Sequence, residues 1–127
     1  MIILDRVLRE RQAASQPIRV AMIGAGYMGR GLALQINRYT PGMELVAIAN
    51  RTVSGAERAY SESGIESLQY VESQSALEDA IRKGQYSVTA DAQLVCRAEG
   101  IDAIIEVTGE IEFGASVVLR QLIMASM

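Results

Sequence analysis

The sequence predicts an α/β fold in which a parallel β-sheet carries helices on both faces. Short apolar segments alternate with amphipathic ones along the chain, and this alternation is typical of strand–helix–strand units. The apolar segments are bounded by proline or glycine, which indicates strands buried on both faces. Half of the 127 residues are hydrophobic, which is enough for the core of one domain over residues 1–127.

Charge and apolar patterning exclude several classes of partner. The chain has 12 basic and 15 acidic residues and a net charge of −3, with no basic tract, so we expect no nucleic-acid partner. No apolar window approaches the ~18 residues of a membrane span, and the first residues are too charged for a signal peptide. We therefore expect a soluble, cytoplasmic protein that does not associate with membranes.

Cysteine and histidine usage restricts the possible chemistry. A single cysteine, Cys96, cannot form an internal disulfide and lies in a predicted helix, where we expect it in the core. Histidine is absent, which removes the commonest general acid–base group and the commonest metal ligand. The acidic residues show no metal-ligand spacing either, so we expect neither a metal site nor a catalytic residue in this chain.

The first half of the chain shows clear helix and strand periods. Apolar residues at helical spacing predict an additional amino-terminal helix over residues 3–14. An apolar run predicts the first strand at 18–24, and a helix with one apolar face follows at 27–38. A second apolar run, after a Thr-Pro-Gly turn, predicts a buried strand at 43–50.

Two segments have the spacing of a capping box, a serine followed three residues later by a glutamate, and each precedes a glycine at which a helix would end. They are Ser54 to Glu57 before Gly64, and Ser75 to Glu78 before Gly84.

The remaining elements are predicted from apolar runs and glycine stops. We expect a strand at 86–90, a helix at 91–99, a strand at 101–109 and a helix at 113–127. The four strands should lie in the order 3-2-1-4, which leaves the outer edge of the fourth strand unpaired. That edge and the apolar helix after it predict self-association as a homo-oligomer.

Three glycines lie where the first strand turns into a helix, in the G-x-G-x-x-G spacing of dinucleotide-binding turns. Gly24 allows the tight turn, Gly26 lets a pyrophosphate approach the backbone, and Gly29 lets the helix lie close to the sheet. Backbone N–H groups at Tyr27 and Met28 would point at the anion, which the helix dipole also favours. The alternative is a tight turn that binds no ligand. Arg30, beside this turn, is expected to be a solvated helix residue.

The residues after the second strand predict the choice of dinucleotide. NAD-binding proteins usually carry a carboxylate about 20 residues after the glycines, where it binds the ribose 2′-hydroxyl. Asn50, Arg51 and Thr52 occupy this place instead. A carboxylate would repel a 2′-phosphate, whereas Arg51 can pair with it and its two neighbours can add neutral hydrogen bonds. We therefore expect NADP rather than NAD, with a solvated loop cation as the alternative for Arg51.

Polar residues also follow the fourth strand, near the carboxyl edge of the sheet where ligands bind in such folds. Thr108 and Gly109 are expected near the ribose–nicotinamide half of the cofactor. Glu106 interrupts an apolar run. It either contacts the cofactor or a substrate domain, or is a hydrogen-bonded structural carboxylate, and the sequence does not distinguish these roles.

The segment LDRVLRERQAASQPIRVAMIGAGYMGRGLALQI, together with VAIANRT and IDAIIEVTG, resembles the amino-terminal part of homoserine-dehydrogenase-like oxidoreductases that carry a carboxyl-terminal SAF domain. The resemblance covers essentially the whole chain. It implies an NAD(P)-binding Rossmann domain, truncated from a longer protein whose substrate and catalytic part follows. It also implies three groups of cofactor contacts: Gly24, Gly26, Tyr27, Met28 and Gly29 for the pyrophosphate, Arg51 for the 2′-phosphate, and Thr108 and Gly109 for the ribose.

The resemblance implies a parent enzyme that transfers hydride between NADPH and a small carbonyl substrate, while this chain alone is expected to be inactive. Some relatives are deoxyxylulose-phosphate reductoisomerase-like enzymes of isoprenoid precursor synthesis, which is the alternative activity. A non-catalytic module that senses a dinucleotide is the alternative from another class, because fold alone does not separate the two. A Rossmann domain for an adenosylated methyl donor is less consistent with Arg51, because that ligand has no 2′-phosphate.

Overall fold

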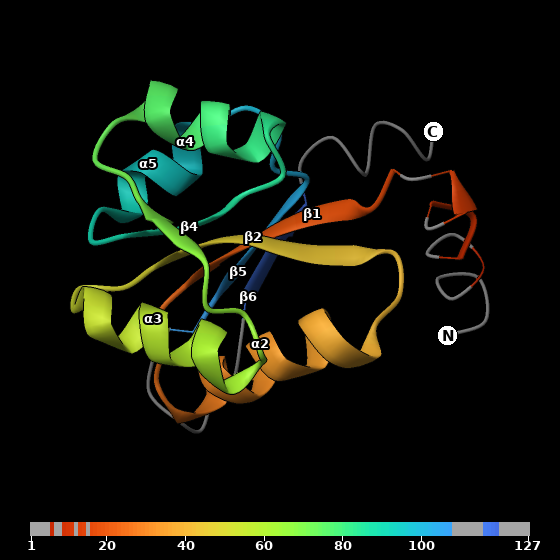
Figure 1. Ribbon diagram of the computed structural model, residues 1–127, viewed down its shortest axis with the longest axis horizontal. Coiled ribbons are helices and arrows are strands. Elements are labelled where there is room, and N and C mark those ends of the chain that lie inside the picture. Colours follow the sequence, from red (N-terminus) through yellow and green to blue (C-terminus); the bar gives the residue numbers. More distant parts are fainter. Residues whose placement is uncertain (1–5, 7–8, 12, 15, 108–115, 120–127) are drawn as a thin grey trace.

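A computed structural model describes residues 6, 9–11, 13–14, 16–107 and 116–119, which form one sheet with helices on both faces (Figure 1). The predicted α/β, doubly wound architecture is confirmed. The strands are β1 Ile18–Ile23, β2 Met43–Ala49, β3 Leu68–Tyr70, β4 Tyr86–Thr89, β5 Ala103–Glu106 and β6 Ser116–Leu119. The helices are α2 Tyr27–Tyr39, α3 Val53–Glu62, α4 Gln74–Arg82 and α5 Ala92–Arg97.

The sheet order is β3-β4-β2-β1-β5-β6. Its central part, β4-β2-β1-β5, is the predicted order 3-2-1-4, and all pairs from β3 to β5 are parallel. Parallel pairing requires a crossover between successive strands, and the helices supply it.

Two strands of the sheet were not predicted. The short strand β3 extends the sheet beyond β4, and β6 pairs with β5 in the antiparallel direction. The helix predicted at 113–127 is therefore wrong at 116–119, and the rest of that segment lies outside the described residues. The sequence predicted an unpaired outer edge for the fourth strand. This prediction is wrong for β5, because β6 pairs with that edge.

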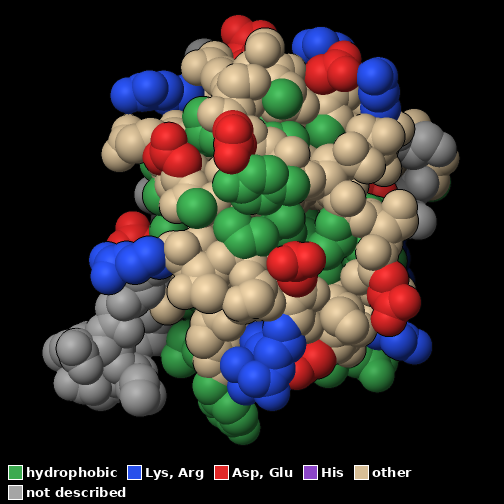
Figure 2. All heavy atoms as spheres, turned by 60° about the vertical axis from the view of Figure 1, so that its left-hand side comes forward, with side chains coloured by type: hydrophobic (Ala, Val, Ile, Leu, Met, Phe, Trp, Pro, Cys, Tyr) green, Lys and Arg blue, Asp and Glu red, His purple; other side chains and the backbone are tan. Residues whose placement is uncertain are grey.

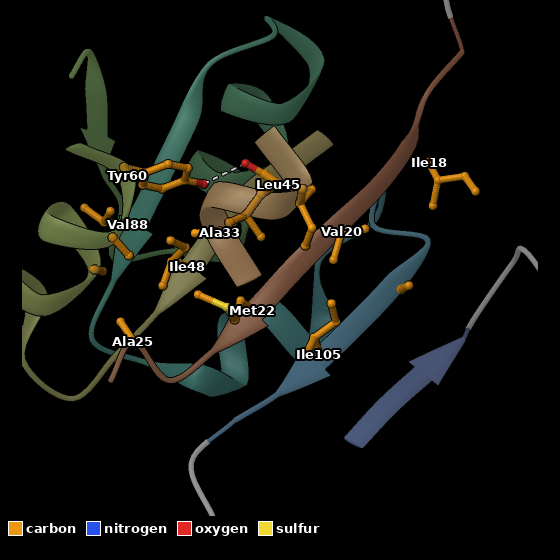
Figure 3. Packing of buried hydrophobic residues seen from close by; sticks show 14 residues of the cluster. Ile18, Val20, Met22, Ala25, Ala33, Leu45, Ile48, Tyr60, Val88 and Ile105 are labelled. Atoms are coloured by element: carbon orange, nitrogen blue, oxygen red, sulfur yellow. Dashed lines mark hydrogen bonds between the residues drawn. The ribbon is translucent and has the colours of Figure 1, made fainter. Parts of the chain in front are cut away.

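Each face of the sheet has its own hydrophobic core. Between the sheet and α2 and α3, the first cluster includes Val20, Met22 and Ile48, together with Ala33 and Tyr60 from the helices (Figure 3). On the other face, side chains of β1, β2 and β5 pack against α4 and α5. Members of this second cluster include Ala21, Val46, Ala47, Ile104, Leu77, Ile81, Leu94 and Val95.

A β-bulge interrupts the pairing of β1 and β2. Val20 pairs with Leu45, but the next residue of β1, Ala21, pairs with Ala47, so Val46 is an extra residue on β2. At this point the buried Tyr60 hydroxyl donates a hydrogen bond of 2.9 Å to the Leu45 carbonyl (Figure 3). Burial raises the pKa of Tyr60 well above its ordinary value, so the hydroxyl keeps the proton that it donates.

The helix starts differ from the predicted capping boxes. The helix α3 begins after Thr52 without a side-chain cap, so Ser54 lies inside the helix. For α4, the Ser73 side chain accepts from the Ala76 N–H, two residues before the predicted cap. Glu78 instead binds the Glu99 N–H at 2.8 Å, which ties α4 to the end of the α5 segment.

Two other expectations concern the amino-terminal segment and Cys96. Among residues 3–14, the described positions 6, 9–11 and 13 are helical. Cys96 is exposed and was wrongly placed in the core, because the short helix α5 buries its neighbours Leu94 and Val95 instead.

Within the part of the chain that the structure describes, no helix has the length and hydropathy that crossing a membrane requires.

Candidate functional site

A cavity of about 570 Å³ lies at the carboxyl edge of the parallel strands. Residues at the ends of β1, β2 and β4, the start of α5 and the residue after β5 line it. In open α/β sheets this edge is where ligands bind, next to the point at which the strand order reverses. The lining residues are Ile23, Gly24, Ala25, Gly26, Ala49, Asn50, Arg51, Thr52, Ala90, Ala92 and Val107.

The glycine turn forms one wall of this cavity, and its three glycines differ in their surroundings. Gly24 has a φ of 102°, which side chains disfavour, and its N–H donates to the Ala49 carbonyl at 2.7 Å. A Cβ at Gly26 would meet no atom within 4 Å, so the space over its backbone is open. A Cβ at Gly29 would lie 3.1 Å from the Gly24 carbonyl oxygen and 3.3 Å from Val107 Cγ2. Gly29 therefore allows α2 to lie close to the turn and to the end of β5.

The start of α2 has unsatisfied hydrogen-bond donors. Its N-cap residue is Gly26, which supplies no side-chain acceptor, and no acidic residue lies in the first turn. The first intrahelical bond runs from the Arg30 N–H to the Gly26 carbonyl, so the earlier N–H groups of the helix have no acceptor within it. This end of the helix can accept an anion.

Tyr27 and Met28 do not line the cavity with their side chains. The Tyr27 side chain is 88 % exposed and Met28 is 39 % exposed. Both line a second, shallower depression of about 480 Å³ on the outer side of α2 and α3. Only their backbone N–H groups, at the start of α2, can serve the predicted anion contact.

The turn after β2 forms the opposite wall of the cavity. Asn50 directly follows β2, and its backbone N–H donates to the Thr89 carbonyl at 2.9 Å, which fixes it beside β4. Its side-chain amide donates to the Thr52 carbonyl at 2.7 Å. Arg51 is exposed, and no ion pair of the described residues includes it. Its guanidinium group is therefore available to an anionic ligand.

Among the described residues that line the cavity, Arg51 is the single charged one. The described residues contain no group of three acidic, cysteine or histidine side chains that could hold a metal ion. The cavity thus offers backbone donors, one cation and small apolar side chains. This set of described residues is suited to binding an anionic ligand, and none of its members is a general acid–base group.

Other predicted residues lie away from this cavity or outside the described residues. Thr108 and Gly109 lie outside the described residues. Glu106, the last residue of β5, is exposed and does not line the cavity.

Arg30 was wrongly expected to be solvated, since its Nε lies 3.2 Å from Glu62 Oε1 and its side chain is only 24 % exposed. A hydrogen bond from Arg58 and the charge of both arginines lower the pKa of Glu62.

Six of the described lining residues were not predicted as site residues: Ile23, Ala25, Ala49, Ala90, Ala92 and Val107. They are small or β-branched apolar residues at strand and helix ends, and nothing in a single sequence separates them from ordinary core residues. Their position at the carboxyl ends of the parallel strands is the one signal that could have identified them.

Charged side chains of both signs are scattered over the face of the molecule seen in Figure 2, where hydrophobic side chains gather near the centre. That view turns forward the left-hand side of Figure 1, on which the loop between β2 and α3 lies. No extensive basic surface is visible on this face.

Residues 18–114 match the family model GFO/IDH/MocA, described as an oxidoreductase family with an NAD-binding Rossmann fold. The match covers more than half of the chain and includes all residues that line the cavity. No curated protein matches the chain.

Proposed function

Because the chain belongs to the GFO/IDH/MocA oxidoreductase family with its NAD-binding Rossmann fold, we propose that it is the cofactor-binding domain of an NADP-dependent oxidoreductase. The family supports a nicotinamide dinucleotide as the ligand. The phosphorylated form, and the roles of the individual residues, are our proposal. The cofactor supplies the hydride when bound, and the chain supplies its binding and orientation.

The pyrophosphate is assigned to the glycine turn. The open space over Gly26 allows phosphate oxygens to approach the backbone, and the uncapped start of α2 supplies N–H donors from Tyr27, Met28 and Gly29. Gly24 and Gly29 hold the turn and the helix in place for this contact. Thr108 and Gly109 are proposed for the ribose half of the cofactor.

The observation that carries the choice of NADP is Arg51. It lines the same cavity as the glycine turn, it is exposed, and none of the described residues that line the cavity is a carboxylate that would repel a 2′-phosphate. A guanidinium group binds phosphate through charge-assisted hydrogen bonds. Asn50 and Thr52 are proposed to add neutral contacts beside it.

Titration of the chain with NADPH and NADH tests this proposal. NADPH should bind more tightly, and Arg51→Ala should remove most of the difference. A charge-assisted contact contributes about 1.5–3 kcal/mol, so NADPH affinity should fall roughly tenfold or more. Arg97→Ala is the matched control, because it removes an exposed cation that does not line the cavity. Equal affinities for both dinucleotides in the unaltered chain would refute the choice of NADP.

The parent activity that we propose is hydride transfer to a small carbonyl substrate in the cytoplasm, by an enzyme that resembles homoserine dehydrogenase and carries a SAF domain. We also propose that this chain alone is inactive, since the described residues that line the cavity include no general acid–base group. The reductoisomerase-like activity and the non-catalytic sensor are the alternatives that assays of the full reading frame would separate.

We also propose a homo-oligomer, but the edge at which the chains would pair differs from the one that the sequence predicted. Beyond β5 the described sheet ends at β6, so the outer edge of β6, rather than that of β5, is the proposed place for a second chain to pair. Sedimentation over a concentration series tests this, and a strictly monomeric species would contradict it.

A further inference from the structure

Gly55, in the first turn of α3, lies against the Asn50 side chain. A Cβ at Gly55 would be 2.6 Å from Asn50 Nδ2, a separation that real Cβ atoms essentially never show, and 4.0 Å from the Ala25 Cβ. Its backbone is not in the left-handed region, unlike that of Gly24 or Gly64. Since glycine is unfavourable within a helix, neither φ nor helix propensity accounts for it at this position.

The Asn50 amide occupies this space for a specific contact. Its Nδ2 donates to the Thr52 carbonyl at 2.7 Å, and the Gly55 N–H donates to the same carbonyl at 3.0 Å. Since the carbonyl only accepts, the nitrogen of the amide must face it. The backbone of Asn50 is held separately, by the bond to Thr89. Arg51 thus lies in a turn that is fixed at both ends.

We infer that Gly55 is a positioning residue that sets the preference between NADP and NAD. By carrying no side chain, it lets the Asn50 amide bind the Thr52 carbonyl, and this bond holds the turn that presents Arg51 to the ribose 2′ group. A side chain at Gly55 displaces the amide, breaks the bond and releases the turn. The inference rests on the proposed function, because it concerns the same cofactor site.

The test compares two glycine substitutions in neighbouring helices. Gly55→Ala should lower NADPH affinity about tenfold while NADH affinity changes much less, because the 2′-phosphate contact alone depends on Arg51. Gly31→Ala is the matched control: Gly31 is exposed within α2, a Cβ there would meet no atom within 4 Å, and it does not line the cavity. It should leave both affinities unchanged.

A double-mutant cycle with Asn50→Ala separates positioning from a general loss of structure. Asn50→Ala alone should reproduce the loss of NADPH preference without a steric clash. Adding Gly55→Ala to it should cause no further loss, because the amide that the new methyl group displaces is already absent. The melting temperature without cofactor should show the same coupling.

The outcomes distinguish the inference from the proposed function. If the unaltered chain binds neither dinucleotide, the proposed function fails and the inference fails with it. If the unaltered chain prefers NADPH and Gly55→Ala keeps this preference, or if the effects of Gly55→Ala and Asn50→Ala simply add, the inference alone is overturned.

Discussion

Three glycines at the start of α2 should respond differently to the same change to alanine. At Gly29 the new methyl group would lie 3.1 Å from a backbone oxygen, 3.3 Å from Val107 Cγ2 and 3.4 Å from Met22 Cε. Overpacking of this kind costs about 1–3 kcal/mol, and the better helix propensity of alanine offsets about 1 kcal/mol. Gly29→Ala should therefore lower the free energy of unfolding by about 1 kcal/mol and the melting temperature by ~4 °C.

Gly31→Ala supplies the opposite expectation in the same helix. Its methyl group meets no neighbour, so only the helix propensity changes and the chain should gain about 1 kcal/mol. Gly26→Ala also meets no neighbour, but its methyl group projects where the pyrophosphate is proposed to bind. Stability should change by less than about 0.5 kcal/mol. Dinucleotide affinity should fall roughly 5- to 150-fold, the equivalent of 1–3 kcal/mol of overpacking.

Urea unfolding and a dinucleotide titration, made on all three variants, measure these two quantities separately. If Gly29→Ala stabilised the chain as much as Gly31→Ala, the close approach of α2 to the turn would be refuted. If Gly26→Ala folded and bound NADPH with unchanged affinity, the glycine turn would not be the phosphate site.

Three further predictions concern side chains that hold the fold. Tyr60→Phe should destabilise the chain by about 1–3 kcal/mol in urea unfolding, because the buried Leu45 carbonyl loses its donor. Ser73→Ala should cost about 1 kcal/mol by removing the α4 cap, whereas Ser54→Ala should be nearly neutral. The pKa of Glu62 is lowered in the folded chain, so its ion pairs stabilise above the ordinary carboxyl pKa of 4.5, and this contribution is lost as the pH falls further. Unfolding from pH 7 to 3 should thus depend less on pH in Glu62→Gln.

The central sheet and the glycine turn could be predicted from the sequence because both depend on local signals. Buried parallel strands are apolar throughout, and the three glycines meet local steric demands, such as the positive φ of Gly24 and the short contacts at Gly29. The order of the four central strands is the one expected of a doubly wound dinucleotide-binding domain, which the glycine turn indicated. These features required no knowledge of distant contacts.

The two outer strands depend on non-local pairing and were missed for that reason. The strand β3 has three residues, Leu68–Tyr70, of which two are exposed, so no period could reveal it. The strand β6 lies in an apolar segment whose period also fitted a helix, and pairing with β5 decides the outcome. The cap of α4 shows a smaller error of the same kind, since several serines precede the helix and only geometry selects Ser73.

The bulge in β2 makes the two ends of that strand unequal with respect to insertions and deletions. After the bulge, Ala47 to Ala49 pair one to one with Ala21 to Ile23, so the number of residues there fixes where Asn50 enters the cavity. Losing one residue in this stretch would turn the later side chains to the opposite face of the sheet. The turn before β2 lies at the far edge, where a longer loop costs little closure entropy. Of the two ends of this strand, a tag or label is thus better tolerated next to Pro41 than beyond the bulge.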